Sequence, residues 1–304
     1  MSEPKDTGSR AEVAAGALYV VATPIGNLGD LAPRAQAVLH GVDRIAAEDT
    51  RTSGALLGHF GIRTPLVALH EHNEDRIAEA LIRAVVEGRS LALISDAGTP
   101  LISDPGYALV RAARAAGVPV YAVPGPCAAI AALSVSGLAT DAFVFIGFLP
   151  PKSGARRAKL ATLANEPRTA IVYESAHRIG DSLEDLVAVL GATRRICLAR
   201  ELSKLYEEST TLPAAELLAW HKADPNRARG EFVLVIEGVA QVDDAAEGER
   251  VLRLLLAELP ASRAARLAAA ITGAARKPLY ALALKLADDA APRDAEIGDH
   301  DEPS

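Results

Sequence analysis

The sequence predicts an α/β protein made of two α/β domains with a cleft between them and a small C-terminal helical segment. Three observations lead to this fold class. Short apolar runs alternate with helical stretches between residues 17 and 123, a second series of apolar runs fills 124–240, and only helical patterns follow over 247–287. Alternation of strands and helices is typical of a mostly parallel sheet with helices on both faces. The 304 residues suit about two domains.

In the first domain, apolar runs and their breaks place five strands and four helices. The strands are expected over 17–23, 42–49, 65–69, 90–94 and 118–123. The helices are expected over 31–41, 52–60, 74–88 and 105–117. For the helix 74–88, Asn73 is the expected cap, Gly88 the end, and the apolar face is Ile77, Ala80, Leu81, Ala84 and Val85.

The second domain is expected to hold a mixed sheet. Its strands are predicted over 142–149, 169–175, 195–200, 209–212 and 231–238, and its helices over 156–164, 177–191 and 214–220. The run 195–200 is followed at once by 207–212 with no helix between them, which favours an antiparallel pair. Three helices should follow the second domain, over 249–260, 261–273 and 277–287. The two ends of the chain, 1–16 and 288–304, are predicted to be disordered.

Charge is distributed unevenly along the chain. The formal net charge is −7, yet residues 250–285 carry seven basic side chains and one acidic one, and residues 288–304 carry seven acids and one Arg. Cys127 and Cys197 form no CxxC pattern, which fits a reducing cytoplasm. The N-terminus lacks the apolar core of a signal peptide, and no apolar run approaches the roughly 18 residues of a membrane span.

Four unusual loops follow predicted strands of the first domain, over 23–30, 48–54, 96–106 and 124–129. The carboxyl ends of parallel strands lie at one edge of a sheet, where ligands bind in open α/β folds. Each loop alone has a plain alternative: TPIGNLGD can be an ordinary turn, PGPCAA a Pro-initiated helix start, and Asp96 an Asx-turn or a helix cap rather than an acceptor for a ligand. Their convergence therefore carries the prediction of a binding site.

Several long strings, in order, resemble one known family. They are LYVVATPIGNLGDL, AEDTRTSGALL, SDAGTPLISDPGYALV, VPGPCAAIAALSVSGL, FIGFLP, YESAHRI, ARELSKLYEE and GEFVLVIEG. The family is that of ribosomal RNA small subunit methyltransferase I, within the tetrapyrrole methylase superfamily. The resemblance runs from about residue 18 to 238 and less sharply through ITGAARKPLYALAL. TPIGN replaces the usual GxGxG-type loop, and Ala176 stands where the related proteins have Pro.

The resemblance implies S-adenosylmethionine as cofactor, a homodimer, and 2′-O-methylation of cytidine 1402 in the decoding region of 16S rRNA in the small ribosomal subunit. It implies the following cofactor-cleft residues: Pro24, Asp96, Gly98, Thr99, Cys127, Ala128, Tyr173, Ala199 and Phe232. Carboxylates and cations at strand ends are candidates to activate the ribose hydroxyl or hold phosphates: Glu48, Asp49, Glu174, Arg51, Arg178, Arg200 and Lys204. For each of these the plain alternative is a salt bridge at a loop.

RNA contact is expected mainly from the basic stretch PPKSGARRAKL, through Lys152, Arg156, Arg157 and Lys159, whose alternative is a solvated loop. The basic segment 250–285 is a second candidate, or else a plain helical bundle. HEHNE at 70–74 offers too few ligands for a metal, so none is expected. Two other functions stay open: methylation of a tetrapyrrole or other small molecule, and a cofactor-sensing RNA-binding protein without turnover.

Overall fold

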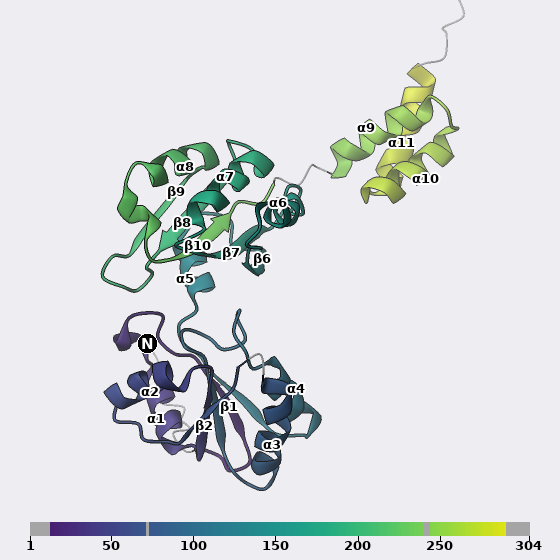
Figure 1. Cartoon of the computed structure of the whole chain (residues 1–304). Coiled ribbons are helices and arrows are strands. Elements are labelled where there is room, and N and C mark those ends of the chain that lie inside the picture. Colours follow the sequence, from purple (N-terminus) through teal and green to yellow (C-terminus); the bar gives the residue numbers. More distant parts are fainter. Residues whose placement is uncertain (1–12, 71–72, 240–243, 290–304) are drawn as a thin grey trace, which may run out of the picture. The chain divides into compact units, whose positions relative to one another are not determined.

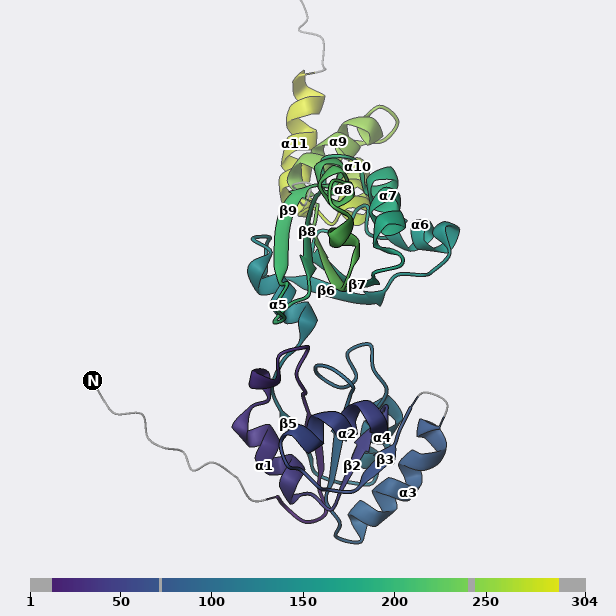
Figure 2. The ribbon, with the colours of Figure 1, turned by 60° about the vertical axis from the view of Figure 1, so that its left-hand side comes forward.

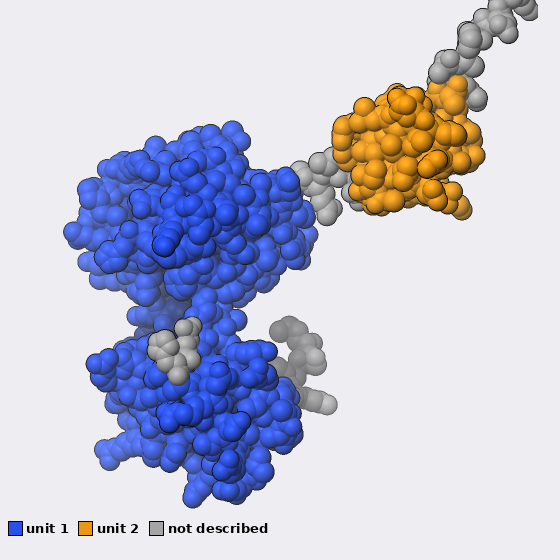
Figure 3. Space-filling view, turned by 45° about the vertical axis from the view of Figure 1, so that its right-hand side comes forward, with its two compact units in different colours: residues 1–239 blue, residues 240–304 orange. Residues whose placement is uncertain are grey.

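The computed structural model describes residues 13–70, 73–239 and 244–289. The chain forms two compact units that divide after Val239 (Figure 3). The first unit contains two sheets, one in each of two lobes, residues 13–123 and 128–239. The second unit consists of helices.

A five-stranded parallel sheet forms the centre of the first lobe. Its order is β3-β2-β4-β1-β5, so that the first strand lies between the fourth and the fifth. The strands are β1 (Leu18–Val21), β2 (Arg44–Ala47), β3 (Leu66–Ala68), β4 (Leu91–Ile94) and β5 (Val120–Val123). The order places the loops that follow β1, β2 and β4 next to one another at the carboxyl edge.

Helices cover both faces of this sheet, as its apolar strands require. One face packs on α1 (Pro33–Gly41) and α2 (Thr50–His59), the other on α3 (Glu74–Val86) and α4 (Tyr107–Ala115) (Figure 1). The predicted apolar face of α3 is corrected in part: Leu81 and Val85 are buried, but Ala80 is exposed and Ala78 and Ile82 take its place. Helical positions four apart, here 78, 82 and 81, 85, share the face.

Asn73 stands at the N-terminal cap position of α3, as predicted, but its side chain does not cap the helix. Instead its Oδ1 accepts a hydrogen bond from the His70 N–H at 2.9 Å, and its amide nitrogen donates to the carbonyl of Ala68 at 3.2 Å. The side chain therefore closes the turn between β3 and α3.

The second lobe contains a mixed sheet in the order β6-β7-β10-β8-β9. Its strands are β6 (Phe143–Phe148), β7 (Thr169–Ser175), β8 (Arg195–Arg200), β9 (Glu208–Pro213) and β10 (Glu231–Ile236). Only β6 and β7 are parallel, and the predicted antiparallel pairing of β8 with β9 is confirmed. One face packs on α6 (Ser153–Ala161), α7 (Ile179–Leu190) and α8 (Ala214–Lys222), and the other on α5 (Ala128–Val135) (Figure 2).

The second unit contains three helices, α9 (Asp244–Leu256), α10 (Ala261–Thr272) and α11 (Arg276–Asp289), around a core of Ala and Leu side chains. The predicted fold class is therefore confirmed: two α/β domains and a C-terminal helical segment. None of the helices in the described parts of the chain is long and apolar enough to cross a membrane.

Both segments predicted to be disordered overlap with parts of the chain that the structure describes as ordered. Val13 packs on the first core and the Ala14 N–H donates to the Tyr19 hydroxyl, so residues 13–16 are part of the first lobe. Helix α11 continues to Asp289, into the segment predicted as acidic tail. The remaining residues of both predicted segments lie outside the described ranges.

Candidate functional site

The four unusual loops meet at the carboxyl edge of the first sheet, as predicted. Thr23 and Gly98 exchange two backbone hydrogen bonds of 2.8 and 3.1 Å, which joins the loops after β1 and β4. The Asp49 N–H donates to Oδ1 of Asp96 at 3.1 Å and so adds the loop after β2. The Thr99 hydroxyl donates to the carbonyl of Pro126 at 2.9 Å and adds the loop after β5.

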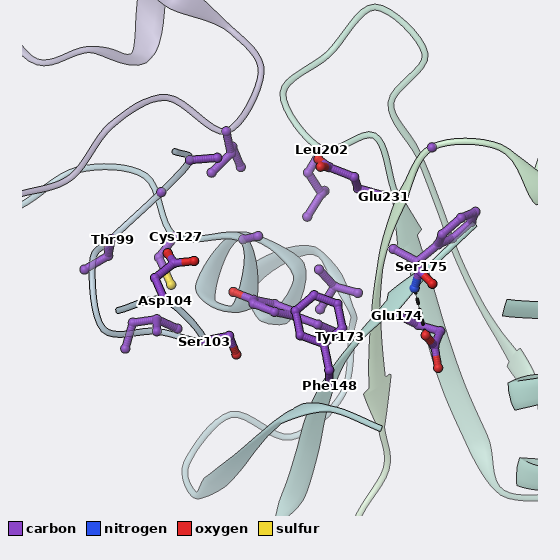
Figure 4. A pocket seen from close by; sticks show the side chains of 18 of the residues that line it. Thr99, Ser103, Asp104, Cys127, Phe148, Tyr173, Glu174, Ser175, Leu202 and Glu231 are labelled. Atoms are coloured by element: carbon purple, nitrogen blue, oxygen red, sulfur yellow. Dashed lines mark hydrogen bonds between the residues drawn. The ribbon is translucent and has the colours of Figure 1, made fainter. Parts of the chain in front are cut away.

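A cavity of about 320 Å³ lies between these loops and the second lobe. One wall comes from the first lobe and the start of α5, and the other from β7, β10 and the loop after β8 (Figure 4). The residues that line it are Ile25, Ala97, Gly98, Thr99, Ile102, Ser103, Asp104, Cys127, Ala128, Phe148, Tyr173, Glu174, Ser175, Ala176, Leu202, Gly230, Glu231, Phe232 and Val233. Most of this lining is apolar or small.

Tyr173 contributes an aromatic wall whose position is fixed by its neighbours. Its ring packs edge-on against Phe145 and Phe148, with ring centroids 5.0 and 5.6 Å away. Its hydroxyl oxygen accepts a hydrogen bond from the Ala129 N–H at 3.1 Å, at the start of α5. Burial raises the pKa of the phenol, so Tyr173 stays neutral and serves as a flat surface rather than as a charge.

Backbone strain is concentrated around the cavity. Gly98 has φ +82°, and a Cβ there would lie 3.3 Å from Cγ2 of Ile25. Two pairs of non-glycine residues also adopt positive φ, Leu101 with Ser103 in one wall and Glu201 with Ser203 on either side of Leu202 in the other. Such conformations persist when the surrounding structure holds them, and they are common at functional sites.

Three carboxylates lie in the cavity lining, and none of its described residues is Lys, Arg or His. Glu174 is fully buried and turned away from the cavity (Figure 4); it is paired with Arg178 at 2.6 Å and accepts hydrogen bonds from Ser182 and from the Ser175 N–H. Glu231 is paired with Lys204 at 2.8 Å. The third, Asp104, forms no ion pair within the described residues.

Asp104 was missed by sequence reasoning, although it is the second Asp of the quoted string DAGTPLISDPG. Burial raises the pKa of its carboxyl to about 6; a hydrogen bond from Ser95 opposes the shift, and the negative charges of Glu48 and Asp96 add to it. The two Asp residues have different roles. Asp96 accepts a hydrogen bond from another loop, whereas Asp104 faces the cavity.

The predicted cofactor residues divide into two groups. Those that line the cavity are Gly98, Thr99, Cys127, Ala128, Tyr173 and Phe232. Pro24, Asp96 and Ala199 lie outside the lining, and Ala199 is fully buried in the core beneath α5. The apolar members that sequence reasoning missed include Ile25, Ile102 and Leu202, whose only signal was an apolar residue in a bend-rich loop.

Among the predicted catalytic residues only Glu174 lines the cavity. Asp49 is the cap of α2 and pairs with Arg51, which holds the pKa of its carboxyl at about 2. Arg200 bonds to Glu208 and to the carbonyls of Asn226 and Arg229. For these residues the structure shows the plain alternative, a cap or salt bridge at a loop. Glu48 acts on the site through its charge, as described for Asp104.

Lys204 joins the loops after β8 and β1. Its Nζ pairs with Glu201 at 2.9 Å and with Glu231, and its stem passes so close over Gly26 that a Cβ there would clash with Cγ of Lys204. The adjacent Ser203 hydroxyl donates to the Asp30 carboxylate. The two lobes are therefore in direct contact at this side of the cavity.

Of the four predicted RNA-binding residues, three are exposed and one is buried. Lys152, Arg157 and Lys159 are exposed at the start of α6 or along it. Arg156 is buried and its Nε donates to Oδ2 of Asp185 at 2.7 Å. A buried, paired guanidinium has no surface to offer a phosphate, so Arg156 has a structural role in this lobe.

No metal site is apparent in the described parts of the chain, where no group of three or more His, Cys, Asp or Glu side chains has suitable geometry. His70 lies near Asn73, with 3.1 Å between a ring nitrogen of His70 and Nδ2 of Asn73. Glu71 and His72 of the HEHNE string lie outside the described residues.

The two α/β lobes, with a cavity at the rim of a parallel sheet, match a family of methyltransferases. The model of the Tetrapyrrole (Corrin/Porphyrin) Methylases family matches residues 17–218, and that of the RsmI C-terminal HTH domain matches residues 242–287. The chain therefore belongs to the tetrapyrrole methylase family and, within it, to the ribosomal RNA small subunit methyltransferase I group.

Curated relatives from several bacteria carry that group's name. The ribosomal RNA small subunit methyltransferase I of Escherichia coli O157:H7 is 56% identical over 277 residues, which are 90% of this chain and 97% of the relative. That of Xylella fastidiosa (strain Temecula1) is 57% identical over 267 residues, 87% and 98% of the two chains. A solved uroporphyrin-III C-methyltransferase from Thermus thermophilus, complexed with S-adenosyl homocysteine, shares the fold with a TM-score of 0.51 and 20% identity over 74% of this chain and 99% of its own.

Proposed function

We propose that this protein transfers a methyl group from S-adenosylmethionine to the ribose 2′-oxygen of cytidine 1402 in the decoding region of 16S rRNA, as a homodimer in the cytoplasm. The observation that supports it most is the cavity at the rim of the first sheet. Its lining combines apolar and aromatic walls with an unpaired carboxylate and has no basic side chain among the described residues. The high identity with relatives named for methylation of small-subunit rRNA supports the substrate.

The cavity fits such a cofactor on chemical grounds. S-adenosylmethionine combines a flat, largely apolar adenine with a cationic centre, and the lining offers Tyr173, Phe232 and Ile25 as flat or apolar surfaces. Gly98 allows close approach of the backbone, and Asp104 offers negative charge. When bound, the cofactor supplies an activated methyl group, so that the protein mainly has to hold donor and acceptor in line.

Glu174 contributes to this site by positioning rather than as a base. Its carboxylate is occupied by Arg178, whose NH1 also donates to the carbonyl of Leu149 at 3.1 Å. Glu174 thereby fixes the end of β7, which carries Tyr173, against the end of β6, which carries Phe148. We further propose that Arg51 holds an RNA phosphate. Its side chain is 90% exposed at the rim of the first sheet, beside Asp49.

For the RNA itself we propose two basic surfaces. The first is the exposed face of α6 with Lys152, Arg157 and Lys159. The second lies on the C-terminal unit, where five cations are exposed and form no ion pair within the described residues: Arg263, Arg266, Arg276, Lys277 and Lys285. Arg250 and Arg253, by contrast, are paired with Glu247 and Glu249 on their own helix.

The test of this function uses purified protein, methyl-labelled S-adenosylmethionine and small ribosomal subunits from cells that lack the gene. The expected product is label in the ribose of one cytidine, located by nuclease digestion and mass spectrometry. If the label appears only in added porphyrinoids, the alternative hypothesis, methylation of a tetrapyrrole or other small molecule, would be supported instead. Binding of both cofactor and RNA without transfer would support a non-catalytic RNA-binding protein.

Charge neutralisation on α6 should weaken RNA binding in a salt-dependent manner. The double change Lys152→Gln and Lys159→Gln removes two phosphate contacts. The plot of the logarithm of the RNA-binding constant against the logarithm of the salt concentration should therefore become less steep, by about 1.4–1.8 in the magnitude of its slope. Filter binding between 50 and 300 mM salt measures this slope. The control is Arg89→Gln, an exposed cation paired with Asp43 at the opposite edge of the first sheet, which should leave the slope unchanged. An unchanged slope in the double variant would exclude α6 from the RNA interface.

A further inference from the structure

The carboxylate of Asp104 occupies a position that the other acidic residues of the cavity do not share. Glu174 is turned away and neutralised by Arg178, and Glu231 is neutralised by Lys204 at the edge of the cavity. Asp104 lies in the wall that also contains Thr99 and Cys127, facing the wall of Leu202 and Glu231 (Figure 4). It is half-buried and, within the described residues, has no cationic partner.

Among the described residues, the groups that act on the Asp104 carboxyl are either neutral or negatively charged. The neighbouring Ser95 hydroxyl lowers the pKa of its carboxyl, and the charges that raise this pKa are those of Glu48 after β2 and Asp96 after β4. Tyr173 approaches from the second lobe, and it is kept neutral by burial. An ionised carboxylate in such surroundings has an uncompensated charge, which only a cationic ligand in the cavity would balance.

We propose that Asp104 is the specificity-determining residue that makes the cavity prefer the cationic methyl donor over the neutral product that remains after transfer. This inference rests on the proposed function, since it concerns the same cavity. S-Adenosylmethionine carries a sulfonium charge, whereas S-adenosylhomocysteine has a neutral thioether at the same position; the ammonium and carboxylate of the amino acid part occur in both. A carboxylate that faces the sulfur therefore distinguishes donor from product, and one that faces the ammonium does not.

The preference matters for turnover because product that binds as tightly as donor would inhibit the enzyme. Attraction between unit charges is several-fold stronger in a partly desolvated site than in water. Loss of the sulfonium charge on transfer removes that attraction from the product. Asp104 then holds the donor and releases the product, without any change in the shape of the cavity.

The same carboxylate makes donor binding depend on pH. The pKa of Asp104 is about 6, so its carboxyl is mostly ionised at pH 7 and mostly protonated at pH 5. A cation stabilises the ionised form, so donor affinity should fall by roughly 10-fold between pH 7 and pH 5. Affinity for the neutral product should change by less than about 2-fold over the same range, because it has no charge opposite Asp104.

Calorimetric titration of the full chain with S-adenosylmethionine and S-adenosylhomocysteine tests the proposal. Asp104→Asn keeps the size of the side chain and removes its charge. It should weaken donor binding by about 10- to 30-fold at pH 7 and product binding by less than about 2-fold. Asp104→Asn should also abolish the pH dependence of the ratio between donor affinity and product affinity. Asp75→Asn, an exposed carboxylate on α3 with the same charge change, is the control and should alter neither affinity.

The outcomes distinguish this proposal from the proposed function. Wild-type protein that binds neither ligand would overturn both. Binding of both ligands with a donor-to-product ratio that stays constant from pH 5 to pH 7 would overturn the role of Asp104 alone, and this measurement needs no variant. Equal weakening of both ligands by Asp104→Asn would also overturn it, because the residue would then contact a part that donor and product share.

Discussion

Replacement of Asp185 by Ala is expected to lower the free energy of unfolding by about 3–5 kcal/mol, the usual cost of leaving a buried charge without its partner. Asp185 and Arg156 are each 3% exposed at their side chains, and their atoms Oδ2 and Nε are 2.7 Å apart. The other carboxylate oxygen accepts from Arg157, and the Ser153 hydroxyl also donates to the group. Urea unfolding followed by circular dichroism measures the change.

The neighbouring residue on α7 provides the matched control. Glu184 forms an ion pair with Lys222, but both side chains are more than half exposed, so Glu184→Ala should change stability by less than about 0.5–1 kcal/mol. A loss below about 1 kcal/mol for Asp185→Ala would show that the buried pair is not required. The double variant Arg156→Met with Asp185→Leu should recover most of the loss, because no fully buried charge is then left without a partner, and Arg157, which also loses Asp185, is about half exposed to water.

The Asp185 pair should also contribute to acid sensitivity. Burial raises the pKa of this carboxyl, but its bonds to Arg157, Arg156 and Ser153 outweigh burial and hold the pKa below the usual 3.8. A lowered pKa in the folded state means that the contribution is complete at neutral pH and is lost as pH falls below about 4. The difference in stability between wild type and Asp185→Ala should therefore narrow between pH 4 and pH 2.

Gly98→Val is expected to abolish cofactor binding, with a loss of affinity of at least about 100-fold. A β-branched residue at φ +82° is strained, and its Cβ would press on Ile25 in the cavity wall. Relief of that contact requires a shift of Ile25 in the cavity wall or of the Thr23–Gly98 bridge, which joins two of the loops that form the site. Calorimetric titration with S-adenosylhomocysteine measures the loss, and thermal unfolding should show a decrease in stability as well.

Gly117→Val separates the effect on the cavity from the backbone cost. Gly117 follows α4 with φ +71°, and a Cβ there meets no atom within 4 Å. The variant has the same type of backbone strain, of order 1–2 kcal/mol, away from the cavity. It should be destabilised and still bind the cofactor normally. Normal binding by Gly98→Val, or equal loss in both variants, would contradict the placement of Gly98 in the site.

The strands and most helices could be predicted from the sequence because their signals are local. Apolar runs, Pro and Gly breaks and the missing helix between β8 and β9 are all visible within a few residues. The face of α3 was predicted less well, because Ala residues are numerous along that helix and do not mark a side. The convergence of the four loops followed from the parallel sheet, since order and handedness place strand ends together.

The roles of individual side chains depended on contacts that sequence does not display. Arg156 and Arg157 are adjacent and alike in sequence and both bond to Asp185, yet Arg156 is buried and Arg157 keeps about half of its side chain exposed. Asp96 and Asp104 occur in one loop, and only the fold shows which faces the cavity. Glu174 looked like a free carboxylate at a strand end until its partner Arg178 was placed beside it.

The contact between Gly26 and Lys204 has a consequence for the rate at which ligands exchange. The lobes are joined by the chain through residues 124–127 and also by the loops after β1 and β8, where Ser203 bonds to Asp30. Two attachments restrict hinge motion, so the walls are preorganised before a ligand arrives and little free energy is spent on closure. The residence time of a bound cofactor should then depend on the side chains at the opening of the cavity. Gly26→Ala, which displaces Lys204, should shorten this residence time.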